Sequence, residues 1–494
     1  MEIDGGVDAV FDQCTQFFLQ WFRTLPGATF HRDIRIEDLR GRNAGRGIVA
    51  TADIEPDTVL FTIPRASIIC TATSSLPNRI PEVFDTSGAD GNQSEDDDDD
   101  EDDPKSQDSW TSLILIMLYE YLQGSSSRWK PYLDVLPAKF DTPMFWSPAE
   151  LAELQASSVV LKIGKTEADQ MIKRKILPVI RAHENVFFPS GSASLSDDQL
   201  VELSHRMGSA IMAYAFDLEK DDEDEAGREE DDDWVEDREG KTMLGMVPMA
   251  DILNADAVFN AHISHGEDAL TATSLRPIRA GEEILNYYGP LSNGELLRRY
   301  GYVTAEHSRY DVVELPWELI ERRLKERFVA LKSQDWEKVA NLMDPEDTED
   351  SFVIERVSED PDSSGVIHGE AQVRDLPEEL EEQVKDFLKA VKKVHSQSAE
   401  ALSDKNARKE IYLDSVLRAL RDREAQYGTT LENDEGLLKS EQPNGRRDMA
   451  VWVRRGEKRL LREAQVWVAQ QLAELELSTS RPTSSAPTAK RQRI

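Results

Sequence analysis

Three tyrosines surround a sharp break in residues 282–302, which read EEILNYYGPLSNGELLRRYGY. Tyr287 and Tyr288 end a run of β-forming residues, and Tyr300 lies near the far end of the segment. The Gly-Pro pair at 289–290 stops the strand, because proline cannot extend a sheet ladder. A phenol can hydrogen-bond a reacting amine, but three half-buried core tyrosines would give the same pattern.

A short helix is predicted directly after the break. Ser292 and Glu295 have the Ser-x-x-Glu spacing of a capping box, in which each side chain satisfies a free N–H group at the start of a helix. Gly301 is placed to end that helix. Tyr288 is therefore expected at a strand end and Tyr300 in the last turn of the helix.

Two further segments place polar or flexible residues where a ligand could approach. NAGRGIVA (43–50) has glycines at a strand start, which allow close approach of a ligand and equally suit a tight turn. The nearly apolar segment MVPMADILNADAVFNAH (246–262) contains Asp251 and Asn254, three residues apart. Buried polar groups of this kind need partners, which either the backbone or a ligand can supply.

Several common catalytic signatures are absent from the sequence. It has no phosphate-binding Gly-x-x-x-x-Gly-Lys-Ser/Thr loop, no Gly-x-Gly-x-x-Gly opening a helix after a strand, no Gly-x-Ser-x-Gly and no His-Glu-x-x-His. His262 and His265 are three residues apart, but no third ligand lies nearby, so no metal site is expected. The sequence therefore argues against a P-loop enzyme and a doubly wound dinucleotide-binding fold.

Cysteine content and hydropathy indicate a soluble intracellular protein. Cys14 and Cys70 are the only cysteines, which excludes a disulfide framework and a multi-cysteine zinc site. The acidic N-terminal residues do not resemble a signal peptide. LILIML (113–118), the longest strongly apolar stretch, is too short to span a bilayer, so no membrane partner is expected.

The net charge of −37 is concentrated in two acidic runs but not confined to them. Residues 95–103 carry nine acids, and residues 219–239 carry fourteen acids against three bases. An acidic surface disfavours direct binding of nucleic acid and attracts basic proteins. The runs themselves are equally explained as solvated, disordered loops.

The elements that must position these residues divide the chain into β-rich and helical stretches. Apolar residues at helical spacing predict a helix over 7–22, short strands follow over 31–71, and strands return over 243–302. Thr429 to Glu432 has a second Thr-x-x-Glu capping spacing. The expected domains are an N-terminal helix (1–30), a β-rich unit (31–314) with a helical insertion (104–240) and acidic loops (90–104 and 219–240), a helical domain (315–477) and a disordered tail (478–494).

These segments, taken together and in order, resemble the SET-domain protein lysine methyltransferases. The resemblance rests on AGRGIVA, VPMADILNA, NYYGPLSNGELLRRYGYV, AQYGTTLENDEGLL and RRGEKRLL, and it covers roughly residues 15 to 475. It is strongest to the group that includes the Rubisco large-subunit methyltransferases and the fungal ribosomal lysine methyltransferases. It implies an α+β fold, with a SET-domain β fold of knot-like threading (31–314) split by the helical insertion and followed by an all-α substrate-binding domain (315–477).

The resemblance also implies a cofactor, S-adenosyl-L-methionine, and a set of site residues. The cofactor-binding residues would be Ala44, Gly45, Arg46, Gly47, Asn254, Ala255 and Tyr300, the first four through backbone contacts. The substrate-binding residues would be Trp110, Tyr214, Asp217 and Asp251, of which those in the insertion are equally explained by helix packing. The family usually has Asn-His at 254–255, so Ala255 removes an imidazole from the pocket, and the fungal branch shares the Asn-Ala-Asp of this chain.

In the implied reaction a methyl group passes from a sulfonium to a neutral lysine amine. Tyr288 is the expected catalytic residue, and it would hydrogen-bond the amine and direct its lone pair. The turn at 289–290 would bring Tyr288 and Tyr300 to opposite sides of one lysine. Lysine, with a pKa of about 10.4, must first lose a proton, which a desolvated aromatic channel favours.

The expected partner is a basic protein, and the resemblance points to a large-subunit ribosomal protein. Alternatives that remain open are methylation of histone lysine or histidine by the same fold, and a non-catalytic adaptor that binds basic proteins. A monomer without direct nucleic-acid contact is expected. The terminal KRQR and the kinship with nuclear members favour the nucleus, with the cytoplasm as the alternative.

Overall fold

We describe the protein from a computed structural model of the chain. It describes residues 4–42, 44–84, 108–190, 193–218, 243–344, 348–395, 401–438 and 445–480. The acidic runs at 95–103 and 219–239 and the tail beyond residue 480 lie outside these ranges, so the expectation that they are disordered stays a prediction.

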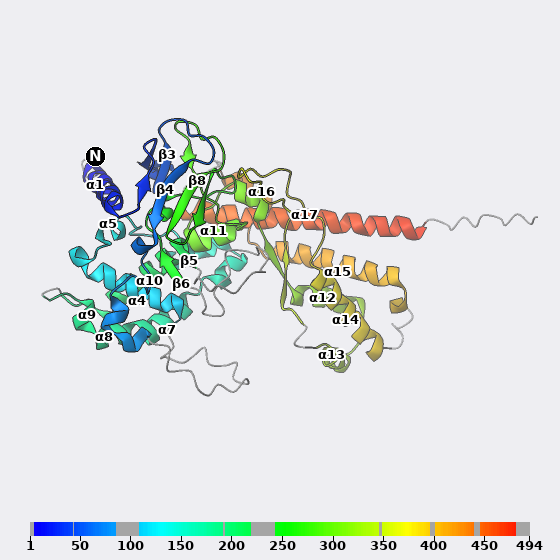
Figure 1. Cartoon of the computed structure of the whole chain (residues 1–494). Helices are drawn as coiled ribbons and strands as arrows, with labels where there is room; N and C mark the ends of the chain where they lie inside the picture. The colour runs from blue at the N-terminus through cyan, green and yellow to red at the C-terminus, as the bar shows by residue number, and fades with distance from the viewer. Residues whose placement is uncertain are drawn as a thin grey trace, which may run out of the picture.

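The N-terminal helix and two small sheets form one end of the molecule (Figure 1). Helix α1 (Asp4–Thr24) buries Phe18 and Phe22 completely, in agreement with the apolar spacing predicted for 7–22. A four-stranded sheet has the order β1-β4-β8-β7, and a three-stranded sheet has the order β2-β3-β9. The strands are β1 (Thr29–Phe30), β2 (Ile34–Asp38), β3 (Arg46–Ala50), β4 (Val59–Pro64), β7 (Ala261–His265), β8 (Ala269–Ser274) and β9 (Glu283–Ile284).

The expected strand before the break is much shorter than its β-forming sequence suggests. β9 ends at Ile284, so Tyr287 and Tyr288 lie beyond the strand in extended backbone. The following residues instead run beside another segment, since Asn286 forms a parallel bridge with Ala255 and its N–H donates to the Asn254 carbonyl at 2.9 Å. The two segments that carry the candidate residues are therefore held together by backbone hydrogen bonds.

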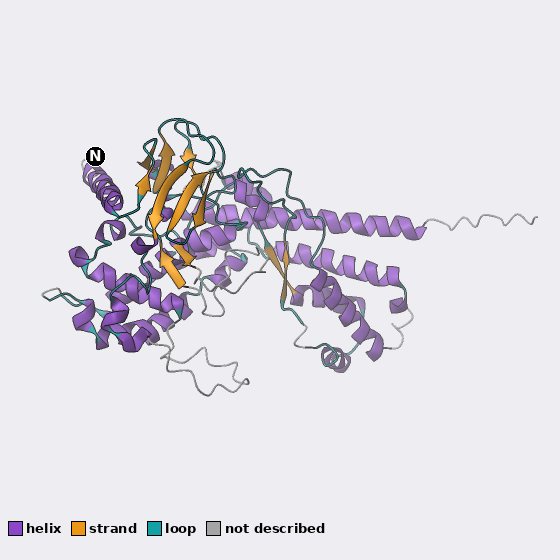
Figure 2. Ribbon diagram, in the orientation of Figure 1, coloured by secondary structure: helices purple, strands orange, loops and turns teal. Residues whose placement is uncertain are grey.

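Helices of the insertion cover the lower end of the sheets in Figure 2. A hairpin of β5 (Ala215–Leu218) and β6 (Met243–Met246) returns the chain from this insertion to the β-rich unit. The helices are α4 (Ser109–Leu122), α5 (Lys130–Leu133), α6 (Pro148–Leu151), α7 (Lys165–Met171), α8 (Leu177–Ala182), α9 (Glu184–Phe187) and α10 (Asp197–Tyr214), preceded by the short α2 (Leu76–Arg79) and α3 (Pro81–Phe84). Most of these helices share one continuous hydrophobic core with the sheets and α1, whereas Leu151 of α6 packs in a different cluster, with Trp146 and Leu154.

The helix predicted after the break is α11 (Asn293–Tyr300), and half of its capping prediction is wrong. The Ser292 hydroxyl accepts the Glu295 N–H at 3.2 Å as expected. The Glu295 carboxylate does not complete the box, because it is occupied by Arg298 and Arg299 at 2.8 and 3.0 Å. Gly301 ends the helix in the left-handed conformation, with φ at +80°.

The described C-terminal residues are mainly helical around a second hydrophobic core and include a small sheet of β10 (Val313–Pro316) and β11 (Ser351–Ile354). Its helices are α12 (Trp317–Arg327), α13 (Ser333–Ala340), α14 (Glu378–Val394), α15 (Lys405–Ala425), α16 (Leu431–Leu437) and α17 (Arg446–Ser480). The capping box predicted at 429–432 is shifted by one residue, with Thr430 and Asn433 as its members.

Helix α17 joins the two parts of the molecule (Figure 1). Its first turns pack with the insertion and α11 in a third hydrophobic cluster, which includes Trp146, Leu297 and Trp452. Across the described ranges, no helix combines the length and apolar character that a membrane span requires.

Candidate active site

Tyr288 and Tyr300 form a stacked pair at the meeting point of the two bridged segments. Their ring centroids are 4.9 Å apart and the ring planes differ by 17°. Tyr288 is 8% exposed, and its hydroxyl donates to the Leu253 carbonyl at 3.0 Å. The expectation that the rings flank one lysine from opposite sides is wrong, because rings in stacking contact leave no space for a side chain between them. They form one wall of the site instead.

Three more tyrosines belong to the same buried cluster, and only Tyr214 was predicted to belong to the site. Tyr302 tilts against Tyr300 at 6.0 Å and donates to the Ala255 carbonyl at 3.3 Å. Tyr132, from α5, faces Asp251, while Tyr214 ends α10. Tyr302 lies in the quoted motif and could have been found there, whereas nothing in the sequence around Tyr132 marks it.

Burial keeps this tyrosine cluster protonated. Desolvation raises the pKa of Tyr288, Tyr302 and Tyr132 well above the usual value of 10, and raises the pKa of Tyr214 and Tyr300 as well. None of these phenols is therefore ionised near neutral pH. The site offers uncharged aromatic walls and neutral hydroxyl groups.

Asp251 is the carboxylate of this cluster. Burial raises its pKa from 3.8 to about 7, against the opposing effects of Tyr132, of backbone N–H groups and of the Arg46 charge. Its Oδ1 atom is buried and accepts no hydrogen bond from any residue that the structure describes. The residue two positions earlier, Met249, is buried with φ at +83°, a conformation that non-glycine residues rarely adopt outside functional sites.

Asn254 connects the motif around residue 254 to the glycine-containing loop. Its amide group donates to the Arg46 carbonyl at 3.1 Å and to the Glu283 carboxylate at 2.8 Å. Gly47 lies directly against this contact, because a Cβ atom there would come within 2.9 Å of the Asn254 amide nitrogen. Asn254 therefore orients the loop with its side chain, which is the structural role that the sequence alone left open.

The loop before β3 combines an open backbone with an anchored arginine. Gly45 has φ at +62° and open space where a Cβ would stand, and Ala44 donates its N–H to the Leu39 carbonyl at 3.2 Å. The Arg46 guanidinium is bound instead to α1, through Thr15 at 2.8 Å and the face of the Phe11 ring at 3.8 Å. The Arg46 side chain is therefore directed to α1, and the open backbone at Gly45 is accessible to a ligand.

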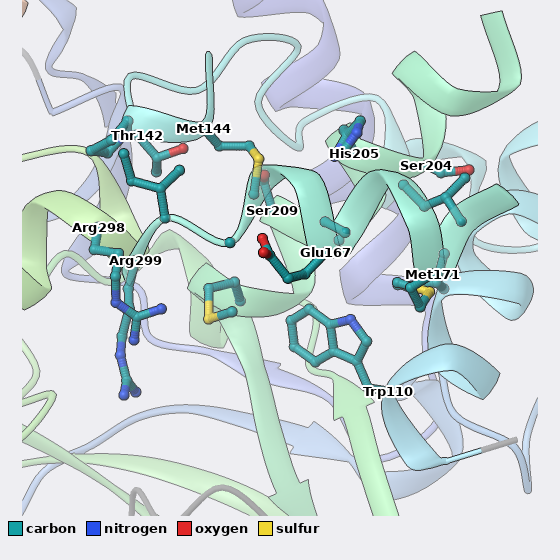
Figure 3. Close-up of a pocket in the computed structure, with 18 of the residues that line it drawn as sticks. Trp110, Thr142, Met144, Glu167, Met171, Ser204, His205, Ser209, Arg298 and Arg299 are labelled. Atoms are coloured by element: carbon teal, nitrogen blue, oxygen red, sulfur yellow. The ribbon is translucent and has the colours of Figure 1, made fainter. Parts of the chain in front are cut away.

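Trp110 and Asp217 lie on two other elements, α4 and β5. Trp110, in the first turn of α4, lines a separate pocket between α4, α7, α10 and α11 (Figure 3). Asp217 lies in β5, in register with Leu244 of β6. The structure thus brings together Tyr288, Tyr300, Tyr214 and Asp251, with Ala255 and Asn254 beside them.

Family profiles match two parts of the chain. The SET domain profile matches residues 45–289, and the Rubisco LSMT substrate-binding profile matches residues 327–461. Yeast (Saccharomyces cerevisiae) ribosomal lysine N-methyltransferase 4 is 34% identical over 323 residues, which are 64% of this chain and 61% of that protein. Human N-lysine methyltransferase SETD6 is 26% identical over 443 residues, 86% of this chain and 84% of that protein. The chain thus spans less than two thirds of the yeast relative's length.

Solved structures share the fold along nearly the whole chain. The SET domain of LSMT bound to lysine and AdoHcy has a TM-score of 0.60 at 20% identity, covering 94% of this chain and 93% of that one. Rubisco LSMT bound to AdoMet has a TM-score of 0.59 with the same coverage. The two profiles, the relatives and the shared fold agree: the chain belongs to the SET-domain family and carries, after its SET domain, a Rubisco LSMT substrate-binding domain.

Proposed function

We propose that this chain is an S-adenosylmethionine-dependent protein-lysine N-methyltransferase acting on a basic protein, with a large-subunit ribosomal protein as the favoured substrate. The observation that carries the proposal is the stacked Tyr288–Tyr300 pair, buried beside Asp251 where the two bridged segments meet. The names of the yeast and human relatives, both lysine methyltransferases, support the activity. The neighbouring structures with lysine, AdoHcy or AdoMet support the pair of ligands.

The residues present fit such a cofactor. The Tyr300 hydroxyl is buried and has no hydrogen-bond partner among the described residues, so a ligand group can satisfy it. The open space at Gly45 leaves a stretch of backbone at the start of β3 that a ligand can approach, whereas Gly47 packs against the side chains of Leu39, Glu283 and Asn254. We assign cofactor binding to Ala44, Gly45, Arg46 and Gly47 through their backbone, and to Asn254, Ala255 and Tyr300. When bound, the sulfonium supplies an electrophilic methyl group.

The protein's own part in the reaction is to desolvate and orient the amine. An uncharged aromatic site disfavours the lysine ammonium, and thereby lowers its pKa from about 10.4. The Tyr288 hydroxyl donates a hydrogen bond to the Leu253 carbonyl, and a phenol oxygen can also accept a hydrogen bond, here from an N–H of the amine. Because its own pKa is raised, Tyr288 orients the amine and does not act as a phenolate base.

Asp251 is suited to receive the proton that the lysine ammonium loses. Its pKa of about 7 lies near the working pH, where a general base is most effective. It also interacts electrostatically with Tyr288 and Tyr214, so it belongs to the same buried cluster. Holding the amine in line for attack can account for up to about 7–11 kcal/mol of the barrier in well-oriented systems.

The charge of the chain supports a basic substrate. A net charge of −37 steers lysine-rich proteins toward the molecule and repels nucleic acid. The name of the yeast relative favours a ribosomal protein over a histone. A nuclear location belongs to the proposal as well, on the basis of the KRQR stretch at 490–493.

Mass spectrometry of salt-washed ribosomes, incubated with the purified protein and S-adenosylmethionine, tests the proposal. We expect one lysine to gain methyl groups, and we expect Tyr288→Phe to slow this by about 100-fold or more while cofactor binding persists. Tyr287→Phe is the matched control, because the hydroxyl of this neighbouring tyrosine hydrogen-bonds Tyr310, at 3.4 Å. It should methylate like the wild type.

Three outcomes would change the conclusion. Methylation of histones but not of ribosomal proteins would replace the substrate and keep the activity. Equal activity in the Tyr288→Phe and Tyr287→Phe variants would remove Tyr288 from the mechanism. Failure to bind S-adenosylmethionine at all would favour the adaptor that binds basic proteins without modifying them.

A further inference from the structure

A cavity of about 400 Å³ lies beside the tyrosine cluster, between α4, α7, α10 and α11. Its wall at Thr142 presses against the residue that follows Tyr300, since a Cβ on Gly301 would lie 2.9 Å from the Thr142 backbone nitrogen. Arg299, in another wall, directly precedes Tyr300 in α11. A peptide whose lysine enters the cluster can therefore place a neighbouring side chain in this cavity.

The inner surface of this cavity suits a long aliphatic stem. Its apolar lining includes Trp110, Ile114, Met144, Met171 and Met212. Methionine side chains adapt to the shape of an occupant, and an indole face attracts both methylene groups and cations. In Figure 3 the Trp110 ring and the methionine sulfur atoms face the same space.

The charged residues of the lining differ in whether they are already paired. Lys162 binds Glu314 at 2.8 Å, and His205 binds Asp169 at 2.5 Å. Arg298 and Arg299 share the Glu295 carboxylate, and their side chains are only 18% and 19% exposed.

Glu167 is the exception. It makes no ion pair or hydrogen bond with any residue within the described ranges. Its side chain is exposed and lies between Trp110 and Met144 in Figure 3.

We propose that this cavity is a specificity subsite for an arginine or lysine side chain next to the target lysine of the protein substrate, with Glu167 as its counter-ion. The inference rests on the proposed methyltransferase function. The aliphatic stem of the basic side chain packs on Trp110 and the methionines, and its cationic end pairs with the Glu167 carboxylate.

Desolvation explains why the occupant is a cation. Any side chain that fills the cavity removes water from Glu167, and an apolar occupant would leave that carboxylate without compensation. An acidic occupant would meet Glu167 directly and would have to compete with Glu295 for the two arginines. A basic occupant satisfies the one lining carboxylate that lacks a partner in the described structure.

A charge-exchange experiment tests this inference. A peptide with one lysine in a neutral background is prepared in two series, with a single arginine or a single glutamate at each flanking position in turn. Binding to the full chain is measured by fluorescence anisotropy, and methylation is measured in parallel. At one flanking position we expect the wild type to prefer arginine over glutamate by about tenfold or more.

The variants separate the subsite from a general effect of charge. Glu167→Gln should abolish the preference at that position, and Glu167→Arg should reverse it. Glu202→Gln is the matched control, because Glu202 is an exposed acid of α10 that does not line the cavity. It should keep the wild-type preference.

Measuring binding and methylation separately distinguishes a failure of the subsite from a failure of the proposed activity. A binding preference that follows Glu167 without any methylation would sustain the subsite and refute the proposed activity. Three results would overturn the subsite: a preference for arginine that is equal at all flanking positions, a wild type that prefers glutamate, or a preference that is unchanged in Glu167→Arg.

Discussion

At the scale of single residues, the candidate site is defined by groups that burial keeps neutral. The Tyr288 hydroxyl is fixed by the Leu253 carbonyl, and the Tyr300 hydroxyl has no partner within the described structure. One phenol is thus pre-oriented and the other is free to meet a ligand. Asp251 alone in this cluster has a pKa near neutrality, at about 7.

Asp251→Asn tests this carboxyl through its pH dependence. Burial raises the pKa of Asp251 in the folded protein from 3.8 to about 7, so its contribution to stability is present below pH 3.8 and is lost as the pH rises through about 7. The variant should therefore gain stability relative to wild type above about pH 7, by at most about 1.4 kcal/mol per pKa unit. Thermal unfolding across this pH range measures the difference.

In Asp251→Asn the effect on activity should have the opposite sign to the effect on stability, because the reaction needs the ionised carboxylate. Wild-type methylation should rise as Asp251 ionises, and Asp251→Asn should be slow without that rise. Asp198→Asn, at the exposed start of α10, is the control and should follow the wild type. If the methylation rate of Asp251→Asn depends on pH as that of the wild type does, another group carries out the proton transfer.

At the scale of elements, α11 carries Tyr300 at one end and is held at the other by a buried aspartate. Asp311 Oδ1 accepts both the backbone and the side-chain N–H groups of Asn293, each at 3.2 Å. Its other oxygen lies against α17, where a Cβ on Gly456 would come within 2.1 Å. The C-terminal part of the molecule therefore contacts the group that fixes the start of the tyrosine-bearing helix.

Gly456→Ala should displace this contact. We expect it to destabilise the protein by roughly 1–3 kcal/mol and to lower methylation, because Asp311 must move away from Asn293. Gly436→Ala, in α16, is the matched control: it has open space around it and should stabilise by up to about 1 kcal/mol. Urea unfolding and steady-state kinetics measure both; equal effects of the two substitutions would show that Asp311 does not depend on α17.

The elements were largely predictable from the sequence, and their contacts were not. Apolar spacing predicted α1, and Ser292 and Gly301 marked the ends of α11. The reciprocal half of the capping box failed because two arginines compete for Glu295, which local spacing cannot reveal. Likewise, Tyr132 joins the site only because α5 packs against the segment of Asp251, a contact between residues far apart in the chain.

The residues of the site were predicted more completely than their geometry. The motifs and the resemblance indicated Tyr288, Tyr300 and Asn254 by type and order. They did not indicate that the two rings stack, since ring orientation depends on packing from α10 and from Tyr302. The motif also could not show that the Asn254 amide is already bound to Glu283.

At the scale of the whole molecule, a buried charge network joins the insertion to the C-terminal helices. Asp434 of α16 is fully buried and binds Lys458, and it also binds Arg454 at 3.0 Å, both from α17. Arg454 in turn binds the Glu153 carboxylate of the insertion at 3.0 Å. Burial alone would raise the pKa of Asp434, but hydrogen bonds from the two cations lower it, so the carboxylate is charged.

Asp434→Asn should therefore be among the most destabilising single changes in this protein. It leaves two cations in a site shielded from water, at a cost of about 3–5 kcal/mol. A double variant, Asp434→Leu with Lys458→Met, should recover much of that loss because it removes a charge of each sign together. Glu432→Gln is the control: Glu432 lies in α16 like Asp434, and its exposed ion pair with Arg462 of α17 should contribute under about 1 kcal/mol.

Urea unfolding of the full chain distinguishes a network that joins two domains from one that stabilises α16 alone. If the network joins the domains, Asp434→Asn should split unfolding into two transitions, the C-terminal helices separating from the SET domain. Methylation of a folded protein substrate should then fall more than methylation of a short peptide, because the helices would no longer be held beside the site. A single transition at a lower midpoint, with both substrates affected equally, would confine the role of Asp434 to local stability.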